Sequence, residues 1–246
     1  MNIFLILAYL FFCGSLMGWV IELLYRRFIS KANPNRKWIN PGFCVGPYIP
    51  LYGFGLCILF LLSTLEPKLG IENQVVSKIV FMCFIMLSLT AIEYLAGLLC
   101  LKLFKVRLWD YSKERFNLQG LICPKFTLIW GVLGAVYFFF IHAHILDSLV
   151  WLSENLTFTF VIGVFYGVFI VDVVYSANLV GKVKAYAQEN EIVVKWEKLK
   201  TDIRCRAEKI GQKPPFLFPM KFYHLIIDRR DKKQKKKIIK IQTAEK

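Results

Sequence analysis

Apolar residues in this chain come in long runs, and short polar segments separate one run from the next. A bilayer is crossed by roughly 20 consecutive apolar residues of α-helix, which is the length of these runs. The pattern therefore predicts an all-α, polytopic transmembrane helical bundle of about five spans. The hydrophobic share of 57% and the mean hydropathy of +0.50 exceed those of soluble domains and agree with it. The predicted spans are Ile3–Tyr25, Tyr48–Leu65, Ile79–Leu101, Phe126–Leu146 and Leu156–Asn178.

The segments between the predicted spans alternate in charge. Segments 26–46 and 102–125 are rich in Lys and Arg, whereas 66–78 has few basic residues and 147–155 has none. Short loops rich in Lys and Arg stay on the cytoplasmic side of a membrane. We therefore expect both basic loops and the C-terminus to be cytoplasmic, and the N-terminus to be outside.

Two parts of the chain repeat one order of features. Each has an apolar span with a glutamate, then a basic loop with Asn, Gly, Cys and Pro, then a span that opens on an aromatic residue followed by glycine. The glutamates are Glu22 and Glu93, and the aromatic-glycine steps begin at Tyr52 and Trp130. This order predicts a parallel 2+2 repeat followed by one more helix. The predicted parts are repeats of about 1–74 and 75–147 and a fifth span of 156–178, within a transmembrane domain of 1–181.

Three carboxylates lie inside predicted spans, where an acidic residue is costly and by default marks a functional or assembly site. They are Glu22, Glu93 and Asp172, all on spans expected to run from outside to inside. Arg26 follows Glu22 by one helical turn, so we expect an ion pair between them. Glu93 and Asp172 have no such neighbour and must be protonated, face water, or find a cation such as Arg107. Interhelical hydrogen bonding, a polar pathway for an ion or solute, and acid–base chemistry all remain open for these carboxylates.

Both basic loops combine turn-forming residues with apolar anchors, as in Trp38-Ile39-Asn40-Pro41-Gly42. One interpretation is a pair of turns at the membrane interface, where Trp and Tyr are favoured. The other is that the loops fold into the cytoplasmic mouth of the bundle and line a site. The candidate residues at this mouth are Arg26, Asn40, Arg107, Asp110 and Asn117.

Residues 182–246 form a basic tail that holds 19 Lys and Arg against 8 Asp and Glu, and so carries most of the net charge of +15. Such a tail beside a span attracts anionic lipids. It can equally be a solvated segment that fixes topology, while its position next to a membrane disfavours nucleic acid as a partner. Apolar residues at helical spacing predict an amphipathic helix over 187–211 that ends at Pro214-Pro215, with an interfacial anchor over 216–220. This helix would lie on the membrane, pair with itself or dock on a partner.

Motifs of nucleotide, hydrolase or metalloprotease chemistry are absent from the sequence: it has no Walker A, GxSxG, HExxH or Rossmann glycine pattern. The seven cysteines show no CxxC or metal-ligand spacing, so we expect free thiols. We predict no catalytic residue, no metal site and no cofactor, which favours a protein that is not an enzyme.

The runs GWVIELLYRR, NPGFCVGPYIPLYGFG and RLWDYSKERFNLQGLICPKFTLIWGVLG resemble the putative ABC-transporter type IV family of small bacterial membrane proteins, over roughly residues 5–180. The resemblance implies a permease-like, transport-related subunit of the bacterial cytoplasmic membrane that needs a separate ATP-binding cassette subunit. It brings no catalytic or binding residues with it, and the substrate is not predicted. Two alternatives stay open: an enzyme acting on a lipid at the cytoplasmic leaflet through Asp110 or a glutamate with Arg107, and a membrane scaffold or sensor. Assembly into a homo-oligomer also stays open.

Overall fold

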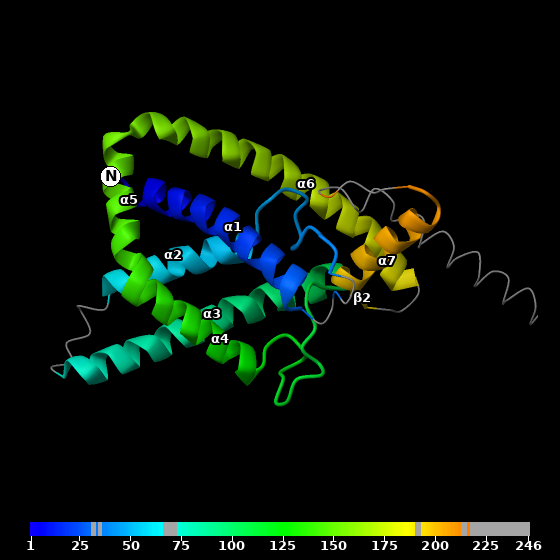
Figure 1. Ribbon diagram of the computed structural model, residues 1–246, viewed down its shortest axis with the longest axis horizontal. Helices are drawn as coiled ribbons and strands as arrows, with labels where there is room; N and C mark the ends of the chain where they lie inside the picture. The colour runs from blue at the N-terminus through cyan, green and yellow to red at the C-terminus, as the bar shows by residue number, and fades with distance from the viewer. Residues whose placement is uncertain (31–32, 34–35, 66–72, 190–192, 213–215, 217–246) are drawn as a thin grey trace, which may run out of the picture.

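The computed structural model describes residues 1–30, 33, 36–65, 73–189, 193–212 and 216, and it is 76% helical. The chain forms long helices with two very short strands near one end (Figure 1). The elements are α1 (Ile3–Phe28), α2 (Pro50–Leu65), α3 (Gln74–Phe104), β1 (Val106–Arg107), α4 (Pro124–Val136), η2 (Tyr137–Ile141), α5 (His142–Glu154), η3 (Leu156–Phe158), α6 (Thr159–Glu189), β2 (Val194–Lys195) and α7 (Trp196–Lys209).

Four helical segments in the described part of the chain are long and apolar enough to cross a membrane: Ile3–Phe28, Gln74–Phe104, Pro124–Glu154 and Leu156–Ala185. The segment predicted as the second span forms a helix too, but α2 has only 16 residues and is shorter than the other four. The largely helical architecture is therefore confirmed, and the described residues contain four helical segments of membrane-spanning length and composition and one shorter apolar helix.

The fourth span is longer than predicted and is bent. It runs through α4, the π-helical turn η2 and α5 without a break, and α5 passes across the end of the bundle (Figure 1). A π-helical turn shifts the hydrogen-bond register, so it is a recognised cause of a bend in a long helix. The bend brings α5 to α1 and α6, where Leu10, Leu152 and Ile162 share one apolar cluster.

Glycines allow α1 to pack closely on α2, and α4 to pack closely on α3. A Cβ atom added at Gly18 of α1 would lie 2.2 Å from the Cβ of Tyr52 on α2. A Cβ added at Gly134 of α4 would likewise lie 2.2 Å from a side-chain carbon of Ile85 on α3. Small residues at such contacts are typical of membrane helices whose backbones approach each other.

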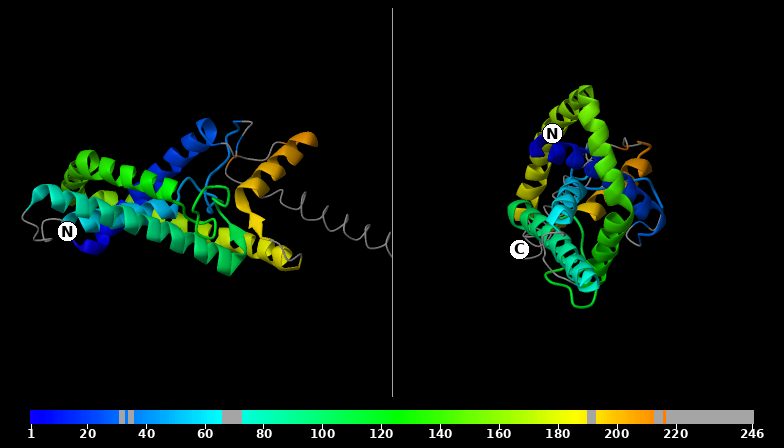
Figure 2. Two further views of the ribbon diagram at one scale, coloured as in Figure 1. Left: turned by 90° about the horizontal axis from the view of Figure 1, so that it is seen from below. Right: turned by 90° about the vertical axis from the view of Figure 1, so that its left-hand side faces the viewer.

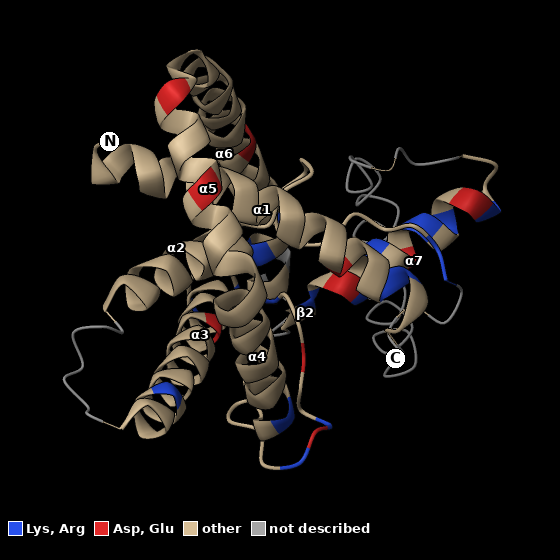
Figure 3. Cartoon of the chain, turned by 60° about the vertical axis from the view of Figure 1, so that its left-hand side comes forward, with Lys and Arg blue, Asp and Glu red and all other residues tan. Residues whose placement is uncertain are grey.

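The loops before α2 and before α4 lie at the same end of the molecule as β1, β2 and α7 (Figures 1 and 2). Charged residues gather there, while the long helices contain few of them (Figure 3). The strands join this end together, since Val106 and Arg107 of β1 pair in parallel with Val194 and Lys195 of β2. The two loops predicted to be cytoplasmic therefore share one end with the beginning of the basic tail.

The tail differs from the predicted helix over 187–211. Helix α6 continues to Glu189, beyond the predicted end at Asn178, and residues 193–195 are extended before α7 begins at Trp196. The β-branched residues Val193 and Val194 favour extended backbone, and the amide of Val194 donates to the carbonyl of Lys105 at 3.1 Å. Ile192, Pro214-Pro215 and the anchor beyond Phe216 lie outside the described residues.

Helix α7 packs against its own chain rather than standing free. Trp196 and Ile203 are almost fully buried in a cluster with Val106, Val180 and Val183, which come from β1 and α6. Ile210, at the end of the predicted apolar stripe, is 49% exposed and does not join the cluster. The partner of the amphipathic stripe is therefore the loop end of the bundle itself.

Candidate functional site

Glu22 lies near the end of α1 and holds two side chains. Its Oε1 accepts a hydrogen bond from Nε of Arg26 at 2.8 Å, which confirms the ion pair expected from their spacing. Its Oε2 accepts from the hydroxyl of Tyr52 at 3.2 Å. Tyr52 sits in the first turn of α2 and can approach because Gly18 leaves room for its ring. The first carboxylate is thus placed between two neighbouring helices.

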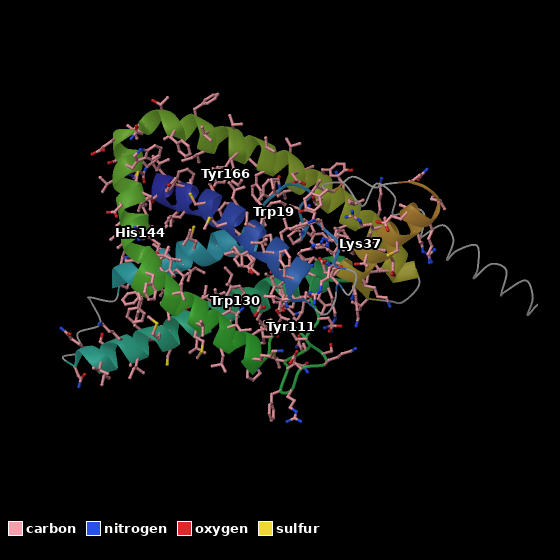
Figure 4. All side chains as sticks on the ribbon, viewed as in Figure 1. Trp19, Lys37, Tyr111, Trp130, His144 and Tyr166 are labelled. Atoms are coloured by element: carbon pink, nitrogen blue, oxygen red, sulfur yellow. The ribbon has the colours of Figure 1, made fainter. Side chains whose placement is uncertain are left out.

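Glu93 lies on α3, is 3% exposed and also accepts two hydrogen bonds. Oε1 accepts from the hydroxyl of Tyr111 at 2.9 Å, and Oε2 accepts from Nε1 of Trp130 on α4 at 2.9 Å (both donors are labelled in Figure 4). The ring of Tyr111 stacks on Phe126 with 4.2 Å between centroids, which fixes the hydroxyl in place. Both donors are neutral, so the cation partner such as Arg107, one of the three possibilities that the sequence left open, is not what holds Glu93 in the structure.

Each of the two glutamates has one aromatic partner on the next helix. Tyr52 and Trp130 are the aromatic residues of the two aromatic-glycine steps in the sequence, and each donates to the glutamate of the preceding helix. Their rings meet, with centroids 5.7 Å apart. We call Glu22, Tyr52, Glu93 and Trp130 the glutamate seam, because they bring α1, α2, α3 and α4 together at one place.

Asp172 is not held by the seam. Its carboxylate accepts from the backbone amides of Val45 at 3.1 Å and Gly46 at 2.6 Å, and from the hydroxyls of Tyr48 and Ser176. Val45, Gly46 and Tyr48 belong to the loop before α2, so Asp172 fastens α6 to that loop. The sequence grouped Asp172 with the two glutamates, but the hydrogen bonds of Asp172 join α6 to the loop before α2.

Asn40 closes the same loop from inside. Its Oδ1 accepts from Nε1 of Trp19 at 2.6 Å, and its Nδ2 donates to the carbonyl of Val45 at 2.6 Å. Asn40 is 3% exposed, and Cys44 beside it is buried as well. Burial raises the pKa of the Cys44 thiol to about 12, so this cysteine is a neutral thiol at physiological pH. The loop is folded into the end of the bundle.

A chain of charged side chains connects the seam with α7. Arg26 pairs with Glu197 as well as with Glu22, and Glu197 lies 3.2 Å from Nζ of Lys200. Lys200 is 3% exposed and donates to the carbonyls of Asn40 at 2.7 Å and Gly42 at 3.0 Å. Burial lowers the pKa of Lys200, because it disfavours the charged ammonium group. Burial alone would raise the pKa of Glu197, but the nearby charges of Arg26 and Lys200 prevail and lower it.

Sequence reasoning missed Glu197 and Lys200. A signal was present, because Trp196, Lys200 and Ile203 follow one another at steps of four and three and therefore share a helix face. A lysine on the buried face of an amphipathic helix needs acceptors, and the carbonyls of the loop before α2 supply them. Arg26 thus forms ion pairs both with Glu22 in the bundle and with Glu197 in the tail.

The remaining candidates organise the loop before α4. Asp110 accepts from Lys195 of β2 and from Ser112, and lies 3.7 Å from Nη1 of Arg107. Burial alone would raise its pKa, but the bonds from Lys195 and Ser112 prevail and lower the pKa to about 2. Asn117 accepts from the amide of Gly120 at 2.9 Å. These residues hold the loop and the tail together.

Comparison with known proteins gives one clear result. The model of the putative ABC-transporter type IV family matches residues 9–177 of the chain. The match covers well over half of the sequence, so the chain belongs to this family, as its motifs indicated. No curated protein and no solved structure matches the chain.

Proposed function

We propose that this member of the putative ABC-transporter type IV family is a permease-like subunit that moves a solute across the membrane, with the glutamate seam as its polar element. One observation carries the proposal: Glu22 and Glu93 each accept a hydrogen bond from the aromatic residue of the next helix, and the rings of these two aromatic residues, Tyr52 and Trp130, meet between the helix pairs. Carboxylates at such depth are costly and are kept where function or assembly needs them.

The equivalent bonds also support a parallel 2+2 repeat. Helix α1 packs on α2 and α3 packs on α4, and Tyr52 and Trp130 touch across the two pairs. In many transporters two repeats surround a central site and move relative to each other. Movement of one pair against the other here would separate Tyr52 from Trp130 and expose the two glutamates.

The energy for this movement would come from a separate ATP-binding cassette subunit, since the chain has no Walker A motif. Its docking surface would be the end that carries α7 and the two basic loops, which we place in the cytoplasm of a bacterial cell. The ion pairs from Glu22 through Arg26 to Glu197 offer a mechanical link from that surface to the seam. In this proposal the tail beyond α7 contacts anionic lipids.

The alternative of a lipid-modifying enzyme has less support. Asp110, its proposed acid or base, is bonded to Lys195 and has its pKa lowered to about 2, whereas a general acid–base works best with a pKa near the operating pH. The alternative of a scaffold whose tail helix binds a partner is weakened for α7, since Trp196 and Ile203 are already buried.

The proposal is tested by purifying the chain from its native membranes, identifying a bound ATPase and reconstituting both in vesicles. We expect ATP hydrolysis that depends on the chain, and we expect Glu93→Gln to reduce it while the complex stays assembled. The matched control is Asp147→Asn. It neutralises a carboxylate on α5 whose side chain is 83% exposed, away from the glutamate seam.

Three outcomes would count against the proposal. Purification without any ATPase would remove the energy source. Full ATP hydrolysis with Glu93→Gln would remove the seam from the mechanism. Loss of the folded bundle in Glu93→Gln, with Asp147→Asn intact, would make Glu93 a structural residue of the kind that joins membrane helices.

A further inference from the structure

The loop between β1 and α4 projects sideways from the bundle instead of continuing along its axis. Figure 1 shows it beside the beginning of α4, and the end-on view in Figure 2 shows it reaching past the outline of the helices. The loop leads directly into Pro124, the first residue of a membrane-spanning segment. A segment that extends laterally at this level lies beside the polar headgroups of the surrounding bilayer.

The tip of this loop is apolar and basic. Phe116 is 88% exposed and Leu118 is 51% exposed, although both are large hydrophobic side chains. Lys113 and Arg115 next to them are exposed as well. The acidic residue of the tip, Glu114, is paired with Lys125 at 3.1 Å. The exposed surface of the loop tip therefore combines two apolar side chains with two cations.

The loop holds this tip in a fixed shape. The side chain of Asn117 donates to the carbonyl of Glu114 at 2.8 Å and accepts from the amide of Gly120 at 2.9 Å. Leu118 and Ile122 form an antiparallel bridge, and the amide of Tyr111 donates to the carbonyl of Gly120 at 2.9 Å. Exposure of Phe116 is thus a property of a hydrogen-bonded loop.

We propose that the loop tip, residues 113–118, is a lipid-binding anchor in the leaflet on the α7 side. Phe116 and Leu118 enter the headgroup region, and Lys113 and Arg115 contact the phosphate groups of anionic lipids. The lateral position and the basic rim favour a bilayer over a protein, because a stable protein interface needs a far larger area than two apolar side chains provide.

This contact would act on the seam through Tyr111. Tyr111 belongs to the same loop, and its hydroxyl donates to Glu93 at 2.9 Å. A loop fixed to the bilayer keeps that hydroxyl in position, whereas a loop pulled away from the bilayer would move it. The anchor does not depend on the transport activity proposed above, so the two can be tested separately.

The test places the photo-reactive residue p-benzoyl-phenylalanine at position 116 of the full chain. The protein is reconstituted in vesicles of phosphatidylcholine, with or without phosphatidylglycerol, irradiated and measured by intact mass. We expect a mass increase of one lipid, and a several-fold higher yield in vesicles with phosphatidylglycerol. Phe140 is 70% exposed on the fourth span, so the same label there is a positive control that should react with lipid in both vesicles.

Two changes separate the parts of the proposal. Lys113→Gln with Arg115→Gln should remove the preference for phosphatidylglycerol and leave the lipid adduct. Absence of a lipid adduct at position 116 while position 140 reacts would overturn the anchor. A cross-link from position 116 to a protein, in native membranes, would also overturn it. Equal yields in both vesicles would refute the role of the two cations.

Discussion

Replacing Gly18 with alanine tests how the seam is built. In the structure a Cβ at this position would lie 2.2 Å from both Cβ and Cγ of Tyr52, and 2.8 Å from its Cδ1. Non-bonded carbons prefer a separation of about 3.5–4.0 Å, so α1 and α2 must move apart by roughly 1 Å or more. Cβ itself cannot rotate away, since it is fixed to the backbone of α2. The new methyl group therefore acts on the helix pair as a wedge.

The expected cost follows from three contributions. Overpacking of a close contact costs about 1–3 kcal/mol. Displacement of Tyr52 weakens its 3.2 Å hydrogen bond to Glu22, which contributes about 0.5–1.5 kcal/mol. Alanine recovers about 1 kcal/mol because it favours helix over glycine. The net effect of Gly18→Ala is a loss of about 0.5–3.5 kcal/mol.

The matched control is Gly167→Ala. Gly167 is also a glycine inside a membrane-spanning helix, but a Cβ there would meet nothing within 4 Å. This variant should be neutral or more stable by up to about 1 kcal/mol. The assay is thermal unfolding in detergent followed by tryptophan fluorescence, where 1 kcal/mol corresponds to about 2–4 °C for a chain of this size. Equal melting temperatures for the two variants would refute the close approach of α1 and α2 at the seam.

Two further predictions concern the tail. Trp196→Ala removes a side chain that is 2% exposed and should cost about 3–5 kcal/mol, so the protection of the α7 amides from hydrogen exchange should fall. The control Ile210→Ala changes a site that is 49% exposed and should leave this protection unchanged. In the folded chain the pKa of Asp110 is about 2, which is below the ordinary value of about 4. The ion pair of Asp110 with Lys195 therefore stabilises the β1–β2 contact fully above a pH of about 4, and this stabilisation is lost as the pH falls toward 2. The protection factor of the Val194 amide should follow that course, and Asp110→Asn should abolish the transition; an unchanged transition in this variant would assign it to another group.

The sequence alone predicted what local rules control. Apolar runs located the helices, and the loops rich in Lys and Arg do share one end of the molecule. The pair of Glu22 and Arg26 follows from helical spacing and is confirmed at 2.8 Å. Glu93 was identified as a candidate, but its donors Tyr111 and Trp130 could not be assigned, because they depend on how α3, α4 and the loop between them fold together.

The tail shows where prediction from local pattern ends. The apolar stripe around Trp196 and Ile203 is present, but the helix does not extend back through residues 193–195. That segment is extended because Val194 pairs with Val106, far away in the sequence. Helical periodicity describes only neighbours along the chain, so it cannot reveal a competing partner of this kind. The same limit applies to Asp172, whose partners lie in the loop before α2.

The parallel pairing of β1 with β2 sets an order of events during synthesis. Val106 is made long before Val194, and α4, η2, α5 and α6 must be synthesised between them before the strands can meet. Until then Asp110 lacks Lys195, and Arg26 lacks Glu197. Chains grow at about 5–20 residues per second, so the loop end waits several seconds for its last component. Completion of this small sheet therefore requires that every helix before β2 has been made, and a chain stalled within α6 would lack both the β1–β2 pairing and the ion pairs of Lys195 and Glu197.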